Sequence, residues 1–200
     1  MLMSQAKALC VYCGSSSGKH PAYVEQARAF GAEMARRGIA LIYGGGKVGL
    51  MGTVADAVLA GGGEVIGVIP RQLVEREVAH PGLTELVVVE TMHQRKTRMF
   101  ELSDAFVALP GGFGTMDEMF EMLTWAQLGL HRYPCAFLNV RGYYDHLHAM
   151  IDHMAEQGFI TPGQHESVWF GQDMTALFDW MPTYHGERAS RLIDKRIVDA

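Results

Sequence analysis

The sequence has no uninterrupted apolar stretch of the roughly 18 to 20 residues that a membrane-spanning helix needs. Its first ten residues, MLMSQAKALC, also lack the layout of a signal peptide. Positive charge is in deficit, since 17 Lys and Arg stand against 22 Asp and Glu and give a formal net charge of −5. Binding of single-stranded nucleic acid favours a basic surface interleaved with aromatic residues, which is not found here. We therefore expect a cytoplasmic protein with no membrane or nucleic-acid partner, in which local groups can still hold a small anion.

Cysteine is scarce, and three residues, an odd number, do not suggest a disulfide framework. Cys10 and Cys13 form a CxxC pattern, which serves a zinc or redox site only if both sulfur atoms converge. The segment ALCVYCG resembles a buried strand, on which residues three apart point to opposite faces. We interpret both residues, and Cys135, as core residues. The nine histidines are scattered, and His93 has no second His or Cys at ligand spacing, so we predict no metal site.

Short apolar runs alternate along the chain with longer helical patterns. The runs lie at 7–14, 39–46, 63–70, 85–91, 104–112 and 134–140, and the helical patterns at 21–37, 49–61, 92–103, 115–129 and 143–157. Most runs show no period of two, which is typical of parallel strands buried on both faces. The alternation predicts an α/β fold with a doubly wound, Rossmann-like, mostly parallel sheet flanked by helices. We expect a single domain over residues 1–200, with its core at about 7–160 and a helical tail at about 162–200.

Three glycine-rich loops follow the first, second and fifth runs: CGSSSGKHP, YGGGKVGLMG and LPGGFGTMDE. Ligands of doubly wound sheets bind beyond the carboxyl ends of the strands, where these loops are expected. GGFGT leads directly into a helical pattern, so its N–H groups and the helix dipole can converge on an anion. Thr115 would act as a phosphate ligand or as the N-cap; the alternative is a tight turn with Thr115 as an ordinary cap. No loop matches the Walker A pattern or the dinucleotide fingerprint GxGxxG, so a dinucleotide oxidoreductase has little support.

Two carboxylates follow the last of these loops. Glu118 lies three residues beyond Thr115, and Glu121 follows on nearly the same helix face. Asp117 and Glu118 could serve only the helix dipole, or Glu118 could complete a capping box with Thr115. A carboxylate placed close to a bound phosphate instead suggests that a sugar lies between them.

The segment TMHQRKTRMF, at 91–100, starts at the same expected edge of the sheet. It brings Arg95, Lys96 and Arg98 within reach of the same ligand, and we expect at least one of the three on a solvated helix face. Arginine suits a phosphate or a purine edge because its guanidinium is planar and permanently charged.

These motifs together resemble the Lonely Guy family of cytokinin riboside 5'-monophosphate phosphoribohydrolases. PGGFGTMDE (110–118) fits the family signature PGGxGTxxE, and MHQRK (92–96) is similar to its second motif. Further similarity extends over roughly residues 7–150, at CGSSSG, YGGGKVGLMG, the IP of 69–70 and LTWAQLG.

The resemblance implies hydrolysis of the N-glycosidic bond of a purine nucleoside 5'-monophosphate, with release of the free base and ribose 5-phosphate and without a cofactor. Arg95 and Glu118 match the catalytic positions, whereas Arg98 stays outside the catalytic set. The implied substrate-binding residues are Gly111, Gly112, Gly114, Thr115, Lys96, Ser15, Gly45 and Glu77. Relatives of this length form homodimers, and the apolar stripe MFEMLTWAQLG would serve either the core or that interface.

Two other functions remain open. Relatives have often been labelled lysine decarboxylases, but neither Lys47 nor Lys96 has an identifiable pyridoxal-binding frame around it. The other alternative is a non-catalytic nucleotide-binding or signalling module on the same fold, which would bind AMP without releasing its base.

Overall fold

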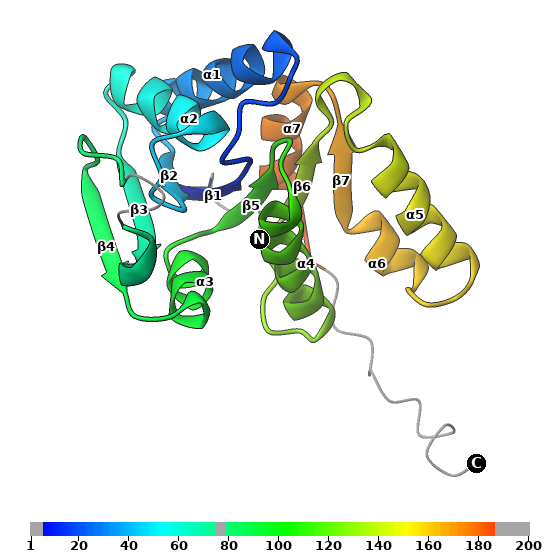
Figure 1. Ribbon diagram of the computed structural model, residues 1–200. Helices are drawn as coiled ribbons and strands as arrows, with labels where there is room; N and C mark the ends of the chain where they lie inside the picture. Colours follow the sequence, from blue (N-terminus) through cyan, green and yellow to red (C-terminus); the bar gives the residue numbers. More distant parts are fainter. Residues whose placement is uncertain (1–5, 75–78, 187–200) are drawn as a thin grey trace.

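The computed structural model describes residues 6–74 and 79–186, which build a seven-stranded, fully parallel sheet (Figure 1). The strand order is β4-β3-β2-β1-β5-β6-β7. The strands are β1 (Ala8–Tyr12), β2 (Ala40–Tyr43), β3 (Val65–Pro70), β4 (Glu85–Val89), β5 (Ala105–Ala108), β6 (Cys135–Leu138) and β7 (Val168–Gly171). All six apolar runs contain a strand, so the predicted α/β doubly wound fold is confirmed. The order reverses at β1, which pairs with β2 on one side and β5 on the other.

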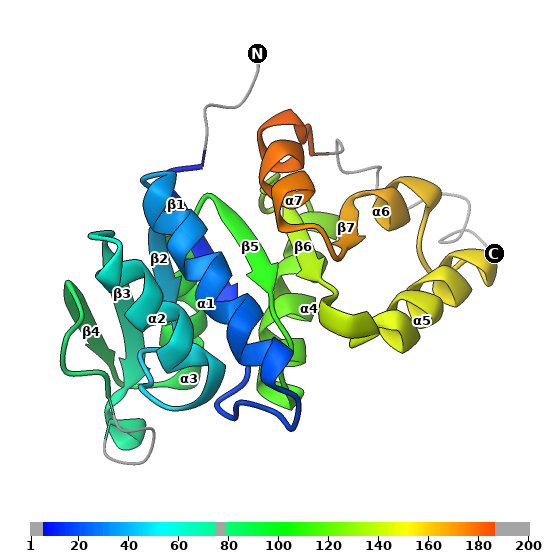
Figure 2. The same ribbon diagram turned by 90° about the horizontal axis from the view of Figure 1, so that it is seen from above.

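Helices cover both faces of the sheet. They are α1 (Pro21–Arg36), α2 (Gly49–Ala60), α3 (Met92–Glu101), α4 (Phe113–Gln127), α5 (Asp145–Glu156), α6 (Pro162–Glu166) and α7 (Met174–Trp180), with short 3-10 turns η1 (Arg71–Leu73), η2 (Val140–Gly142) and η3 (Met181–Thr183). In Figure 2, α1 and α2 lie in front of the strands and α3 and α4 behind them. Each face has its own apolar core, with Phe30 and Val58 packed on one side and Met99 and Met119 on the other. No helix within the described part of the chain is long and apolar enough to span a membrane.

The three cysteines lie in these cores, as predicted. Cys10 packs with the α3 and α4 side of the sheet, and Cys13 with the α1 and α2 side. All three are free thiols, and burial raises their pKa values, to about 12 for Cys135. The side chains of β1 alternate between the two faces of the sheet, and this alternation continues into the following loop. The CxxC spacing therefore places Cys10 and Cys13 on opposite faces.

The expectation of a helical tail from residue 162 is wrong in part. Residues 168–171 form β7, which pairs with β6 and extends the sheet, while α6 and α7 on either side are helical as expected. The sequence VWFG holds a β-branched and two aromatic residues, which favour a strand once a neighbouring strand offers a ladder. Residues 187–200 lie outside the described residues.

Burial on both faces is wrong for β4. This strand lies at the edge of the sheet, and 36% of Leu86 and 40% of Val88 are exposed. Val87 and Val89 point to the other face and pack against the core beside α3. A continuous apolar run therefore does not distinguish a central parallel strand from an edge strand with one uncovered face.

The first prediction concerns the contact between α1 and α2. A Cβ atom at Gly31 would lie 2.6 Å from the Val54 carbonyl oxygen and 2.8 Å from the Ala57 Cβ. We expect Gly31→Leu to force the helices apart and to lower the free energy of unfolding by about 1–3 kcal/mol in urea denaturation. Ala29→Leu replaces a methyl with an isobutyl group at an exposed position of α1 and is the control. Equal unfolding free energies for the two variants would contradict this packing.

Candidate active site

The loop after β5 leaves the N-terminus of α4 open. The N-cap is Gly112, which has no side chain to offer, so no side-chain cap bonds the first N–H groups of this helix. A Cβ placed at Gly112 or Gly114 would meet no heavy atom within 4 Å, so space lies beside both residues. Uncapped N–H groups at the positive end of a 15-residue helix, next to open space, form an anion-binding geometry.

Hydrogen bonds from outside the loop fix the carbonyl groups that precede α4. Three consecutive carbonyl oxygens each accept one: Leu109 from the Tyr144 hydroxyl (2.6 Å), Pro110 from the Gly14 N–H (3.0 Å) and Gly111 from the Tyr143 hydroxyl (2.5 Å). In a trans peptide the N–H points away from the C=O. The N–H groups of Gly111 and Gly112 are therefore directed away from these donors.

Thr115 does not cap the helix, contrary to one of the roles predicted for it. The helix begins two residues earlier, at Phe113, so Thr115 lies in its first turn and is only 4% exposed. Its side chain lies against the backbone of Gly111, where an added Cβ would come within 2.1 Å of the Thr115 Oγ1. Position 111 therefore requires glycine because the threonine occupies the space beside it.

The glycine loops after β1 and β2 have a different role from the loop after β5. Their backbones bond to each other and to the loop after β5, so the start of α2 is not open. The Gly14 carbonyl accepts hydrogen bonds from the N–H groups of Leu50 (3.0 Å) and Met51 (3.3 Å), which closes the start of α2. Gly49 adopts a φ of +68°, and a Cβ there would lie 2.3 Å from the carbonyl carbon of Ser15. Ser15 is exposed, at the point where the first loop crosses the start of α2.

Gly45 is buried in the second loop. Its φ is +79°, and it packs so closely on β3 that a Cβ added at Gly67 would lie 2.8 Å from the Gly45 Cα. Its carbonyl accepts a hydrogen bond from the His80 N–H (3.0 Å). The residue therefore shapes the turn after β2 against β3. Glu77 lies outside the described residues.

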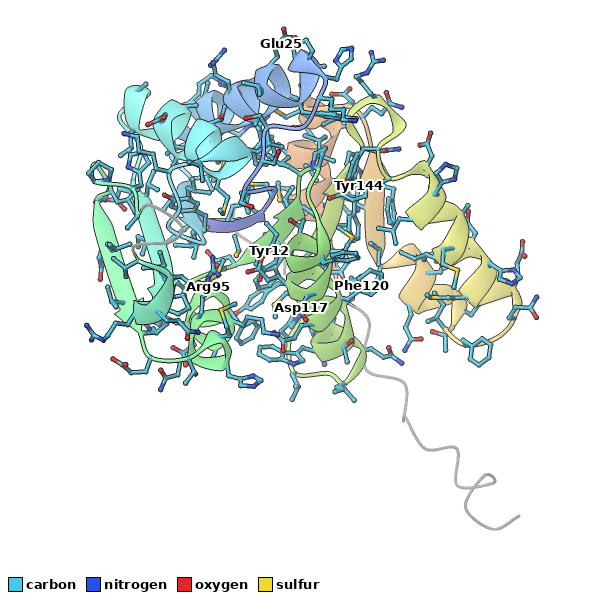
Figure 3. The ribbon with its side chains drawn as sticks, in the orientation of Figure 1. Tyr12, Glu25, Arg95, Asp117, Phe120 and Tyr144 are labelled. Carbon is cyan, nitrogen blue, oxygen red and sulfur yellow. The ribbon has the colours of Figure 1, made fainter. Side chains whose placement is uncertain are left out.

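Arg95 carries its guanidinium from α3 into the carboxyl edge of the sheet (Figure 3). The residue is 5% exposed, and its Nη2 and Nε donate to the carbonyls of Gly44 (3.0 Å) and Val68 (3.1 Å). A Cβ at Gly44 would lie 2.1 Å from Nη2, so the guanidinium fills the space that a side chain would need. A carbonyl just after β2 and another within β3 thus hold a permanent positive charge in one position.

Glu118 of α4 lies near the same end of β1. Burial is the main cause of the raised pKa values of Cys10, Tyr12 and Cys13, and the Glu118 charge raises all three further. The Arg95 charge acts on Cys10 in the opposite direction. The charges of Glu118 on α4 and Arg95 on α3 therefore act on the same thiol with opposite sign.

Lys96 connects α3 to α4 through two ion pairs. Its Nζ lies 3.1 Å from the Glu121 Oε1 and 3.3 Å from the Asp117 Oδ2, and 12% of the side chain is exposed. Burial alone would lower its pKa, but the hydrogen bonds to Glu121 and then Asp117 outweigh it and raise the pKa. The other Glu121 oxygen is buried without a hydrogen-bond partner among the described residues. Glu121 therefore supports the helix pair, and Lys96 is a protonated cross-link.

Arg98 is on the solvated face, as expected for one of the three basic residues, and pairs with Glu101 (3.1 Å). The sequence reasoning missed Tyr143 and Tyr144, which hold the loop before α4. The one feature of the sequence that could have indicated them is that they follow β6, because this strand also ends at the carboxyl edge of the sheet.

These features place the chain in the class of doubly wound α/β proteins, which bind ligands where the strand order reverses. The model of a family described as "Possible lysine decarboxylase" matches residues 51–181. Cytokinin riboside 5'-monophosphate phosphoribohydrolase LOG7 of Arabidopsis thaliana is 53% identical over 80% of this chain and 73% of its own. The phosphoribohydrolase of that name from Rhodococcoides fascians is 50% identical over 84% of this chain and 85% of its own. The chain therefore belongs to the family of cytokinin riboside 5'-monophosphate phosphoribohydrolases, and the predicted resemblance is confirmed.

Solved structures with low sequence identity share the fold. The molybdenum cofactor binding protein from Rippkaea orientalis aligns with a TM-score of 0.66 and 19% identity over 88% of this chain and 95% of its own. DNA processing protein A from Helicobacter pylori aligns with a TM-score of 0.53 and 15% identity over 89% and 81% of the two chains. At these identities the similarity establishes the fold alone and does not indicate which ligand this chain binds.

The second prediction tests the fit of Arg95 against Gly44. We expect Gly44→Ala to push the guanidinium away from the Gly44 carbonyl and to lower the free energy of unfolding by about 1–3 kcal/mol, because a buried charge loses a hydrogen bond. Gly82→Ala is the control, since a Cβ there meets only ordinary contacts at 3.4 Å or more. Urea denaturation of both variants measures the difference, and a Gly44→Ala protein as stable as the control would refute the fit.

Proposed function

We propose that this protein hydrolyses the N-glycosidic bond of purine nucleoside 5'-monophosphates and releases the free base and ribose 5-phosphate. The base is adenine or an N6-substituted adenine. The identity of about one half to relatives named as phosphoribohydrolases supports the reaction. The observation that carries the proposal is the open N-terminus of α4, which begins five residues before Glu118, together with Arg95 held against the backbone of β3 and of the loop after β2.

The 5'-phosphate binds at the start of α4 in this proposal. Gly111, Gly112 and Gly114 supply close backbone approach, and the helix dipole favours the negative charge. Ser15 of the loop after β1, Thr115 of α4 and Lys96 of α3 are proposed to contact the phosphate. Gly45 and Glu77 complete the proposed substrate-binding set. Binding energy from the phosphate is remote from the breaking bond, so it positions the sugar against the catalytic groups.

Glu118 faces the ribose and stabilises the transition state. As the C1'–N bond breaks, its electron pair leaves with the base and positive charge spreads over the ribose ring. A fixed carboxylate beside the ring stabilises this charge. The oxygen of a water molecule then forms the new bond to C1', and the protons of that water are shared between the sugar hydroxyl and the base.

Arg95 orients the reacting groups and does not transfer a proton. Arginine is too basic to be a good proton donor. Because the carbonyls of Gly44 and Val68 fix its position, it can hold Glu118 and the departing purine by charge-assisted hydrogen bonds.

Lysine decarboxylation receives no support from the lysines near the site. A pyridoxal enzyme needs a neutral lysine amine to form a Schiff base. Lys96 is paired with two carboxylates that raise its pKa, and Lys47 is exposed in the second glycine loop.

We also propose a homodimer in the cytoplasm, where nucleoside monophosphates are made. The stripe MFEMLTWAQLG divides between two environments. Met119 and Met122 are buried in the core, whereas Phe120 and Leu123 line a cavity of about 230 Å³ between α4 and α5. Nearby Leu130 is 64% exposed, so an uncovered apolar surface continues beyond this cavity and suits a second copy of the chain.

The third prediction concerns the catalytic pair. We expect Glu118→Gln to bind AMP yet release adenine at least about 10²-fold more slowly, because the carboxylate stabilises charge only in the transition state. Arg95→Ala should also lose turnover while remaining folded. Free base from AMP and N6-isopentenyl-AMP is measured by chromatography. Glu101→Gln, at an exposed residue of α3 that pairs with Arg98, is the control and should keep most of the activity.

Wild-type turnover by Glu118→Gln would refute the mechanism. Binding of AMP without base release by the wild-type protein would instead favour the nucleotide-binding module.

The fourth prediction concerns the phosphate. Gly112→Asp places a capping carboxylate where the phosphate is proposed to bind, and no atom lies within 4 Å of its Cβ. The helix should be as stable as before or more stable, because Asp is a favourable N-cap. The value of kcat/KM for AMP should fall by at least about tenfold, since one lost charge-assisted hydrogen bond costs about 1.5–3 kcal/mol.

The low activity expected with adenosine should change little in the same variant. Equal losses with AMP and adenosine would show that the phosphate does not bind at this helix.

A further inference from the structure

A cluster of two histidines and one aspartate lies far from the catalytic residues along the sheet. His148 and Asp152 are one turn apart on α5, and His165 comes from α6. Figures 1 and 2 show these two helices beyond β7, at the opposite end of the sheet from β4. The cluster takes no part in the proposed hydrolysis.

The three side chains converge on one point. The Asp152 Oδ1 lies 2.6 Å from the His165 Nε2 and 3.8 Å from the His148 Nε2. The ligand atoms of all three lie within 4.8 Å of one another. Zinc bonds of about 2.0–2.2 Å at tetrahedral angles place ligand atoms about 3.3–3.5 Å apart. Small rotations of partly exposed side chains reach that spacing.

Packing already orients the imidazole rings. His148 stacks on Phe170 of β7, with ring centroids 4.4 Å apart and planes 10° apart. The His165 ring is nearly parallel to that of His148, at 17°. A capping box between Thr161 and Gln164 fixes the start of α6 immediately before His165. Both rings therefore present Nε2 to the aspartate before any ion binds.

The kinds of ligand point to zinc. We propose that His148, Asp152 and His165 bind one Zn²⁺ ion, with water at the remaining position. Two imidazole nitrogens and one carboxylate are zinc ligands, whereas Mg²⁺ and Ca²⁺ prefer oxygen atoms alone.

The bound ion would join α5 to α6 and stabilise that part of the fold. Both helices also line the cavity beside α4, through Ile151, Met154 and Gln164. Zinc should therefore raise the thermal stability of the protein and leave base release unchanged. This proposal differs from the prediction of no metal site, which rested on the scatter of histidines along the chain.

The fifth prediction is the binding experiment. The full chain, freed of metal with a chelator, is titrated with Zn²⁺ in competition with a chromophoric zinc indicator at pH 7.5. We expect one ion per chain, and at least about tenfold weaker binding in His148→Ala and in His165→Ala, as for the loss of groups that hold a metal site. His153→Ala removes an exposed histidine from the same helix, where it faces Glu156 (3.6 Å), and should bind as the wild type does.

Thermal melts with and without Zn²⁺ provide a second measurement. The wild type and His153→Ala should gain stability from zinc, and the two site variants should not. Loss of affinity by equal amounts in all three variants would reveal non-specific binding to surface histidines. That result, or the absence of one-to-one binding by the wild type, would overturn the proposal, and the rate of base release from AMP would remain a separate test of the hydrolase.

Discussion

The backbone of Gly14 connects the three glycine loops, and the geometry of the candidate site depends on it. Its N–H donates to the carbonyl of Pro110 before α4, and its C=O receives the first N–H groups of α2. A Cβ at this position would lie 3.0 Å from the Ser16 carbonyl oxygen and 3.4 Å from that of Pro110. Gly14 therefore caps the N-terminus of α2 and positions the loop that leaves the N-terminus of α4 open. Similar glycine-rich sequences at one sheet edge thus have different structural roles.

Adjacent residues of the MHQRK motif show a similar division. Successive residues of a helix point about 100° apart, so Arg95 enters the carboxyl edge of the sheet while Lys96 reaches across to α4. The first residue donates to two backbone carbonyls at that edge. The second is matched by two carboxylates and ties the helices that carry Arg95 and Glu118. The motif therefore contains both a proposed catalytic residue and part of its structural support.

The architecture could be predicted because apolar runs and helical patterns alternate with clear glycine and proline boundaries. The opposite directions of Cys10 and Cys13 followed from the period of a strand in the same way. β7 was missed because four residues are too few to show a period, and its stability comes from pairing with β6. The sequence also predicted a candidate anion loop with a carboxylate after it. It did not predict that the hydroxyl groups of Tyr143 and Tyr144 bond to carbonyls of this loop, which lie more than 30 residues away. Long-range contacts of this kind leave no local pattern.

The hydroxyl groups of Tyr143 and Tyr144 decide whether the glycine loop before α4 loses its conformational entropy on folding or on ligand binding. Glycine has the largest conformational entropy of any residue in an unfolded chain, so ordering this loop is costly. Because the hydroxyls bond the Leu109 and Gly111 carbonyls within the folded chain, that ordering accompanies folding and need not wait for a ligand. A ligand then meets a preorganised loop, and more of its interaction energy remains as affinity. Side chains that follow β6 thus set the binding entropy of a loop that follows β5.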